Sequence, residues 1–251
     1  MLHSTDNLIG FTMGAIDGEI GEVKDFYFDD QTWNIRYLIV ETGNWLFGRK
    51  VLLSPVALEA PHWDARTFPV NLTKDQIKHS PDIDTDKPVS HQQETDLHNY
   101  YSWPINTGAG VGFMTSGMVG GVIAPGIPFA DSISDEVHHH KEDSGAGTEN
   151  VQHPTGNLHL RSFKDFKEYI IYATDGELGE INDFLLDGST WHISSLVVET
   201  GDWYSGKKIL IPANAVQKIE DEHSAIYLDQ SVTEFKDVAE FDYDQLKDQS
   251  N

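Results

Sequence analysis

The side chains best suited to chemistry in this sequence are carboxylates that occur in close pairs. Asp17 with Glu19 forms one pair, and Asp175 with Glu177 forms a second pair of the same spacing. Two neighbouring carboxylates can serve as general acid and general base. Both pairs flank an Asp-Gly turn, however, where acidic residues are ordinary. The sequence also has no Ser-His-Asp order, phosphate-cradling glycine loop or HExxH motif, so we predict no catalytic residues and a protein that is not an enzyme.

Three alternating aspartates, Asp82, Asp84 and Asp86, match the start of a calcium-binding loop. That loop needs glycine where Lys87 stands and a bidentate glutamate where Gln93 stands. We therefore interpret the aspartates as part of a solvated acidic linker.

A run of histidines, His138, His139 and His140, has the side chains that bind transition metals. A specific site needs ligands that the fold holds in place, and this run lies in a Gly/Ser-rich stretch. The sequence has no cysteine, which excludes disulfides, thiolate catalysis and cysteine-ligated metals. We predict no metal site and no cofactor.

The net charge of the 251-residue chain is −24, and the charge is unevenly distributed. Asp and Glu exceed Lys and Arg by 4 in residues 1–80, by 9 in 81–160 and by 11 in 161–251. This field repels phosphate backbones and anionic lipid, so we predict no nucleic-acid partner and expect no membrane docking. The N-terminus has no basic region followed by an apolar run, and the expected compartment is the cytoplasm.

The sequence contains an internal duplication. Residues 17–53 read DGEIGEVKDFYFDDQTWNIRYLIVETGNWLFGRKVLL, and residues 175–211 read DGELGEINDFLLDGSTWHISSLVVETGDWYSGKKILI. The two copies align without a gap, which predicts two similar structural units. Each unit has short β-prone runs with turn signals between them, the pattern of a small sandwich or barrel.

Local signals within each copy predict particular elements. Gly21 and Gly179 lie early in a strand, which indicates a bulge or a sharp bend. Leu38 and Val40 share the strand face that stays apolar in the second copy, so we expect that face in the core. Short helices are expected over 73–79 and 231–238, where Thr73 and Ser231 are N-caps.

The two copies are separated by a segment of different composition, residues 81–160. Residues 90–101 are expected to form a short helix, because Ser90 and Gln93 make a capping box. The rest is a loop rich in Gly, Pro and His. Residues 106–130 are uncharged and contain small-xxx-small spacings, which leaves a membrane segment as one interpretation and a docked or mobile loop as the other. Residues 241–251 are expected to form an acidic tail.

The repeated motif DGEIGEVKDF…TWNIRYLIVETGNW…GRKVLLSP resembles the PRC-barrel family, and the intervening LTKDQIKHSPDIDTDKPVSHQQETDLHNYYSWP resembles the linker of bacterial proteins with two such domains. The family takes its name from the photosynthetic reaction centre H subunit. The resemblance implies a mainly β chain with two tandem small antiparallel barrels, 1–80 and 161–240, with short helices, joined by a helix and a long loop. It also implies an assembly or protein-binding role without catalytic residues.

Candidate interface residues follow from the repeated ETGNW and ETGDW turns. Trp45 and Trp203 occupy equivalent positions there, and exposed aromatic side chains often dominate binding energy. Folding of each ring over its own barrel is the alternative. Glu41 and Glu199 precede these turns, where cross-strand ion pairs with Lys50 and Lys208 also explain their presence. Trp103, which follows the expected helix, completes the candidate set.

The function that we expect is a non-enzymatic binding or assembly module with an unknown protein partner. Small cores and open strand edges also suggest a homo-oligomer, a dimer or higher. The alternative function, which the H-subunit resemblance implies, is a membrane-associated accessory protein of photosynthetic electron transport.

Overall fold

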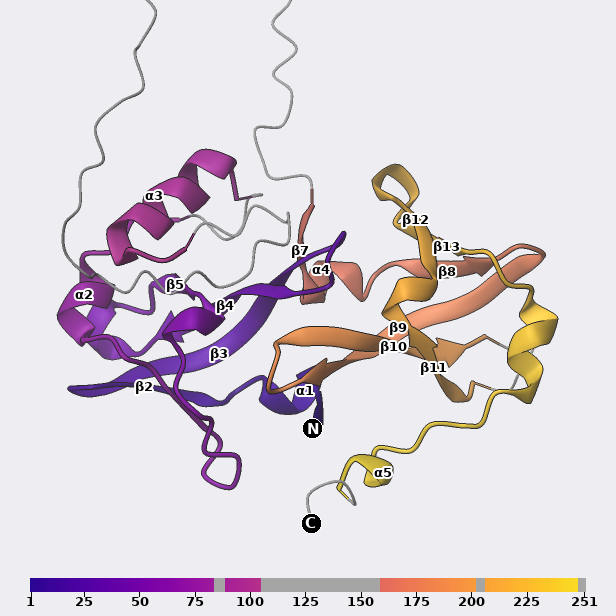
Figure 1. The fold of residues 1–251 in the computed structure, drawn as a ribbon, viewed down its shortest axis with the longest axis horizontal. Helices are drawn as coiled ribbons and strands as arrows, with labels where there is room; N and C mark the ends of the chain where they lie inside the picture. The colour runs from indigo at the N-terminus through magenta and orange to yellow at the C-terminus, as the bar shows by residue number, and fades with distance from the viewer. Residues whose placement is uncertain (84–88, 105–158, 202–205, 248–251) are drawn as a thin grey trace, which may run out of the picture. The chain divides into compact units, whose positions relative to one another are not determined.

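The computed structural model describes residues 1–83, 89–104, 159–201 and 206–247 (Figure 1). Met1–Gly108 and Thr155–Asn251 together form one compact unit. The second unit, Ala109–Pro154, lies outside the described residues, as do the membrane-segment interpretation of 106–130 and the histidine run.

The first repeat folds around a sheet with the strand order β5-β4-β3-β2-β6. Its strands pair antiparallel except for β2 and β6, which run parallel. The strands are β2 Thr12–Ala15, β3 Gly18–Asp29, β4 Ile35–Thr42, β5 Lys50–Leu53 and β6 Thr67–Pro69. The short helices are α1 Thr5–Leu8, η1 Asn44–Leu46, η2 Pro55–Ala57 and α2 Lys74–Lys78.

The second repeat has the same arrangement and one additional strand, in the order β11-β10-β9-β8-β13-β12. Here β8 and β13 are the parallel pair. The strands are β8 Ile170–Ala173, β9 Gly176–Asp187, β10 His192–Thr200, β11 Lys208–Pro212, β12 Val216–Glu220 and β13 Ala225–Leu228. The helices are α4 Phe163–Phe166, η4 Ala213–Ala215, η5 Asp221–His223, η6 Val232–Asp237 and α5 Asp244–Lys247. The prediction of a mainly β chain built from two small tandem barrels is confirmed.

The caps expected from the sequence are present. Thr73 accepts a hydrogen bond from the backbone N–H of Gln76 at the start of α2, and Ser231 forms the equivalent capping box at η6. The expected helix over 90–101 is α3, His91–Tyr101, and Ser90 and Gln93 form its capping box. These short elements begin where the side chain can satisfy otherwise unpaired N–H groups.

Two short strands are exchanged between the repeats. β1, Leu2–Ser4, precedes the first repeat but pairs with β9 of the second. β7, Leu160–Ser162, precedes the second repeat but pairs with β3 of the first. The registers match, because Ser4 lies opposite Leu185 and Ser162 lies opposite Tyr27. Each repeat therefore completes its sheet with a strand from the other.

The apolar cores of the two repeats join into one cluster. Phe163 of the second repeat stacks on Phe184 at a ring distance of 4.4 Å and lies 5.2 Å from Phe28 of the first repeat. The small cores expected for the separate repeats are thus combined into one. The exchanged segments carry apolar residues across, so the structure buries more surface than either repeat could alone.

Gly21 and Gly179 lie where two backbones meet. An added Cβ would stand 2.0 Å from the carbonyl oxygen of Glu41 at Gly21 and 2.1 Å from that of Glu199 at Gly179. Only glycine allows this approach, so the close contact between strands explains these glycines, whereas the sequence analysis expected a bulge or a sharp bend.

Both faces of β4 are buried, which differs from the expectation of one core face. Leu38 and Val40 point into the joint core, as predicted, but Tyr37 and Ile39 are also buried, in a second cluster. The reason is tertiary: residues that follow the first repeat cover this outer face, and periodicity within the strand does not show that cover.

Candidate functional site

The exchanged strands are fixed by two equivalent aspartates that the sequence analysis did not single out. Asp183 accepts hydrogen bonds from the hydroxyls of Ser4 and Thr5 and from the backbone N–H of Asp6 at 3.2 Å. Asp25 accepts from the Ser162 hydroxyl at 2.6 Å and from the backbone N–H of Lys164 at 3.3 Å. Burial raises the pKa of Asp25, and the bonds from Ser162 and the backbone oppose this rise. The signal in the sequence was the Asp-Phe pair that both copies share.

A backbone contact joins the repeats at a second place. The N–H of Ile35 donates to the carbonyl of Trp191, and the N–H of Ile193 donates to the carbonyl of Trp33, both at 2.8 Å. Trp33 and Trp191 have left-handed backbones, with φ of 55° and 58°. Tryptophan rarely adopts this conformation. Its occurrence at both equivalent positions indicates that this contact between the repeats enforces it.

The outer faces of the two sheets have different covers. In the first repeat, α3 lies over β4 and β5 (Figure 1), and its Leu97 joins Ile83 and Val89 against Tyr37, Ile39 and Leu52. In the second repeat, Phe241 is buried against Leu185 and Val197, and Tyr243 and Leu246 pack beside it. The segment after each repeat thus folds back on its sheet.

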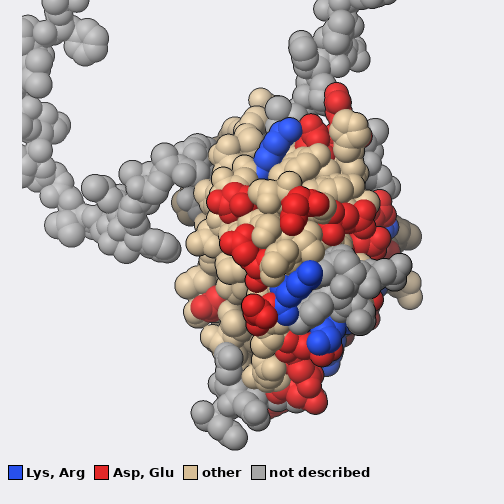
Figure 2. Space-filling view, turned by 90° about the vertical axis from the view of Figure 1, so that its right-hand side faces the viewer, with Lys and Arg blue, Asp and Glu red and all other residues tan. Residues whose placement is uncertain are grey.

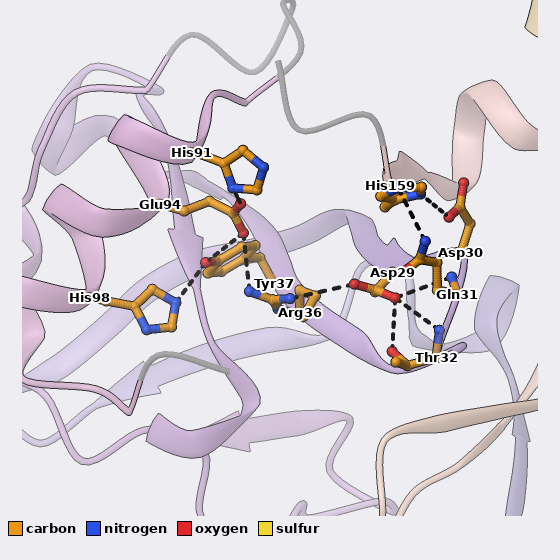
Figure 3. Close-up of polar contacts among 10 residues, drawn as sticks. All are labelled: Asp29, Asp30, Gln31, Thr32, Arg36, Tyr37, His91, Glu94, His98 and His159. Carbon is orange, nitrogen blue, oxygen red and sulfur yellow. Dashed lines mark hydrogen bonds and ion pairs between the residues drawn. The ribbon is translucent and has the colours of Figure 1, made fainter. Parts of the chain in front are cut away.

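A buried polar cluster holds α3 in place (Figure 3). The Tyr37 hydroxyl lies 3.1 Å from Glu94 Oε1 and 2.7 Å from His98 Nε2. Arg36 lies 3.3 Å from Glu94 Oε1 and 3.5 Å from Asp29 Oδ2, so one guanidinium links α3 to the end of β3. Burial raises the pKa of the Tyr37 hydroxyl well above its usual range, with Glu94 acting in the same direction.

The same cluster extends to the turn after β3. Asp29 accepts hydrogen bonds from the N–H groups of Gln31 and Thr32 and from the Thr32 hydroxyl. Next to it, Asp30 pairs with His159 at 2.9 Å and with Arg161 of β7 at 2.7 Å. α3 is therefore linked through Arg36 to Asp29, and the exchanged strand β7 is linked to the adjacent Asp30 (Figure 3).

The predicted interface tryptophans are placed in different ways. Trp45 is partly buried: its Nε1 donates to the Ile20 carbonyl at 2.6 Å, and the Lys74 ammonium lies 4.5 Å from its ring centroid. Trp103 is also partly buried and stacks on Tyr101 at 4.2 Å. Trp203 lies outside the described residues. Trp45 therefore folds back over its own barrel, and Trp103 belongs to the cover of the outer face.

The predicted acidic residues lie at strand ends, as Glu41 and Glu199 do, or in turns, as Asp17 and Asp175 do. Glu41 faces Lys50 across the β4–β5 ladder and also pairs with Lys24 at 3.4 Å. Glu199 faces Lys208 in the same register. Asp17 accepts the backbone N–H of Lys74 at the start of α2, and Asp175 accepts that of Val232 at the start of η6. Helix capping thus accounts for one carboxylate of each pair.

The metal-ligand candidates are not brought together in the part that the structure describes. There, no group of three or more His, Asp or Glu side chains is arranged to hold a metal ion. Asp82 pairs with Arg49 at 3.1 Å, while Asp84 and Asp86 lie outside the described residues. Among the described helices, none is long and apolar enough to cross a membrane.

One end of the first repeat exposes apolar side chains. Phe47, at the tip of the β4–β5 loop, is 97% exposed, and Ile16, in the β2–β3 turn, is 66% exposed. The Trp45–Ile20 hydrogen bond joins this loop to β3, so the loop and the turn lie at the same end of the sheet. In the second repeat, Ser205 is equivalent to Phe47 and Thr174 is equivalent to Ile16.

The second repeat is instead marked by charge. Asp and Glu exceed Lys and Arg by 11 in residues 161–251. Figure 2 shows a face of the molecule on which acidic side chains predominate and basic ones are few. The two repeats thus share a fold but present different surfaces.

Comparison with known proteins identifies the repeated unit. The PRC-barrel domain matches residues 4–77 and 159–234, one match for each repeat. The chain belongs to the PRC-barrel family. A Deinococcus radiodurans relative, described as an uncharacterized protein, is 33% identical over 87 residues, which cover 34% of this chain. Those residues cover 31% of the relative, so the match spans about a third of its length.

Proposed function

We propose that this PRC-barrel protein is a non-enzymatic protein-binding and assembly module. In this proposal the partner binds at the end of the first repeat formed by the β2–β3 turn and the β4–β5 loop. The observation that carries the proposal is the nearly complete exposure of Phe47 at the end of the first repeat that also exposes Ile16. An exposed aromatic side chain near other exposed apolar residues is typical of a binding surface.

The backbone at the loop tip supports this proposal. Phe47 has a φ of 57°, a conformation that bulky residues rarely adopt, and Gly48 follows with a φ of 71°. The loop therefore exposes an aromatic side chain to water on a strained backbone. A polar residue at this position, such as the serine that the second repeat has there, would be exposed at lower free-energy cost. Within the loop, Trp45 is held by its hydrogen bond to Ile20 and its contact with Lys74, and Glu41 lies at the end of β4, where the loop begins.

The experiment is mild cross-linking in the native cells, followed by purification and identification of bound proteins. The test variant combines Ile16→Thr and Phe47→Ser, which introduces the residues that the second repeat already has. Val56→Asn is the matched control, because Val56 is also exposed and its second-repeat equivalent is Asn214. We expect a stoichiometric partner that the double variant loses and the control retains.

Equal recovery of the partner with both variants would place the binding surface elsewhere. Recovery of the chain alone from native cells would contradict binding to another protein and would favour self-association, which stays a separate prediction. The molecular mass of the purified chain by light scattering distinguishes a homo-oligomer from a monomer.

A further inference from the structure

We propose that the interface between the repeats is selective, so that each repeat pairs with its unlike repeat and disfavours a like one. A second copy of this chain then binds only by exchanging unlike repeats, the first repeat of one copy with the second repeat of the other. This inference concerns the contacts of β1 and β7 and does not depend on the binding surface around Phe47.

The centre of this interface is the same in both directions. Ser4 bonds to Asp183 and Ser162 bonds to Asp25, and the members of each contact are equivalent residues of the two repeats. These bonds would also form if two first repeats or two second repeats paired. Selectivity therefore depends on the few positions around them at which equivalent residues differ.

The middle residue of β1 makes the first contact of this kind. His3 stacks on Trp63 of its own repeat, with the ring centroids 3.7 Å apart, and both rings lie against Gly188 of the other repeat. A Cβ added at Gly188 would stand 2.8 Å from His3 Cδ2 and 3.0 Å from Trp63 Cζ2. The stacked rings therefore leave no room for a side chain at this turn.

The middle residue of β7 makes the equivalent contact with charge instead. Arg161 lies 2.7 Å from Asp30 of the other repeat and 2.6 Å from Asp221 of its own. The counterparts of these three residues in the β1 contact are His3, Gly188 and Trp63. Because Asp30 occupies the turn in the first repeat, the turn itself accepts a side chain, and the stacked rings are what exclude one in the second repeat.

Pairing of like repeats would mismatch both contacts. Two first repeats would place the stack of His3 and Trp63 against Asp30, where an overpacked contact costs free energy. Two second repeats would place Arg161 against Gly188, so the guanidinium would lose one of its two carboxylates. Each strand thus fits only the turn of the unlike repeat.

An ion pair between α1 and the end of α4 has the same selectivity. Asp6 pairs with Lys167. Their equivalents are Lys164 and Ile9. Two second repeats would bring Lys167 to Lys164, which places like charges together, and two first repeats would bring Asp6 to Ile9. Only unlike repeats form the ion pair, and like charges act against one of the alternatives.

The buried carboxylate of Asp183 adds a third difference. It accepts a hydrogen bond from the Thr5 hydroxyl at 2.7 Å. The equivalent of Thr5 is Phe163, which cannot donate. Two second repeats would therefore leave this fully buried carboxylate with one hydrogen bond fewer.

The first test builds one mismatch into the full chain. Gly188→Asp gives His3 the neighbour that a second first repeat would offer, and it should raise the equilibrium constant of unfolding about 10- to 100-fold. Adding His3→Arg restores the pair that Arg161 makes with Asp30 and should recover most of that loss. Thr190→Asp adds the same charge at an exposed position of the same turn, and His3→Arg should not recover its effect. Additive effects of Gly188→Asp and His3→Arg would overturn the role of this contact.

A charge exchange covers the case in which Gly188→Asp prevents folding. Asp6→Lys and Lys167→Asp each place like charges together, and each should raise the equilibrium constant of unfolding about two- to fivefold. The two changes together reverse the ion pair and should restore the native value. A loss that persists in the double variant would overturn the role of this pair.

Pairing between copies can be read with cysteine, which the sequence lacks. Asn34 and His192 are exposed, equivalent residues that face each other in an antiparallel bridge. The Cα atoms of such a pair lie about 4.5 Å apart, which a disulfide can span. An equimolar mixture of Asn34→Cys chains and His192→Cys chains is refolded from urea at high concentration in a thiol–disulfide buffer. We expect bonds between positions 34 and 192 to predominate, whereas unselective pairing makes them only as common as the two kinds of like bond together.

Gly188→Asp in the His192→Cys chain separates selectivity from loss of stability. It gives the second repeat the carboxylate that Arg161 of a like repeat would need, so the share of bonds between two positions 192 should increase. A structure that is merely weakened would form fewer bonds of every kind. The proposal is overturned by like bonds as common as unlike ones in the native background, by an unchanged share with Gly188→Asp, or by the absence of any bond between copies.

Discussion

The two repeats are most alike where they meet and least alike where they face outward. We call the region where the exchanged strands β1 and β7 pair with the other repeat the seam. There, Ser4 contacts Asp183 as Ser162 contacts Asp25, and the two exchanged strands pair in equivalent registers. On the outer face, the first repeat has Tyr37 beneath a three-turn helix, whereas the second has Ser195 at the equivalent position and a short C-terminal segment. A residue at the seam must fit both its own repeat and the other repeat, so two sets of contacts restrict which side chain can occupy the position. Each outer face needs to fit only its own cover.

The strongest test of this comparison changes the seam aspartates. Asp183 is fully buried and also accepts bonds from the Phe184 N–H and the Tyr243 hydroxyl. Asp25 is only half-buried. We expect Asp183→Ala to lower the free energy of unfolding by about 3–5 kcal/mol, since it leaves several buried donors unpaired, and Asp25→Ala by about 1–3 kcal/mol.

Urea unfolding followed by tryptophan fluorescence measures both values. Ser54→Ala is a suitable control, because this buried serine caps η2 within one repeat and plays no part in the exchange. Equal costs for the two aspartates would mean that the exchanged strands are held symmetrically, despite their different burial.

A swap of outer-face residues tests whether each face fits only its own cover. Tyr37→Ser gives the first repeat the residue of the second, and it should cost about 3 kcal/mol through loss of a buried ring and its polar contacts. The reverse change, Ser195→Tyr, affects a half-buried position and should cost less than about 1 kcal/mol. Similar costs in both directions would contradict the inferred difference between the covers.

The covers also have one position in common. Ile83 and Phe241 occupy equivalent places in the repeat, and both are buried on the outer face. Ile83→Ala and Phe241→Ala should each cost about 2–3 kcal/mol in unfolding experiments. A much smaller effect for Phe241 would show that the C-terminal segment adds little, so that residues 241–251 behave as the acidic tail expected from composition.

The sequence predicted the elements that depend on neighbouring residues. The gapless duplication and the caps at Thr73, Ser90 and Ser231 all arise from local sequence or from spacing within one repeat. The strand exchange could not be predicted in this way. β1 and β7 are three residues long, too short to show a strand pattern in the sequence. Their partners also lie far away in the sequence, and the local pattern of apolar residues carries no information about such distant pairing.

The sequence pointed to some residues near the candidate site and missed others. The sequence indicated Trp45 and Glu41, which lie at the end that exposes Phe47. It did not indicate Glu94 and His98, because charged residues on a short polar helix normally face water. Their burial depends on Tyr37 and Arg36 of a distant strand. A polar helix can therefore dock by a buried hydrogen-bond network that amphipathic periodicity does not detect.

The smallest expected effect concerns Lys74 and distinguishes two roles of Trp45. Lys74 lies over the Trp45 ring, and its equivalent in the second repeat is Val232. Lys74→Ala should cost about 0.5–1 kcal/mol through the lost cation–π contact, and a double-mutant cycle with Trp45→Leu should recover that amount as coupling. Coupling in stability without loss of partner capture shows that Trp45 only supports the loop. Coupling near zero, with capture lost in Trp45→Leu, makes Trp45 itself a contact residue beside Phe47.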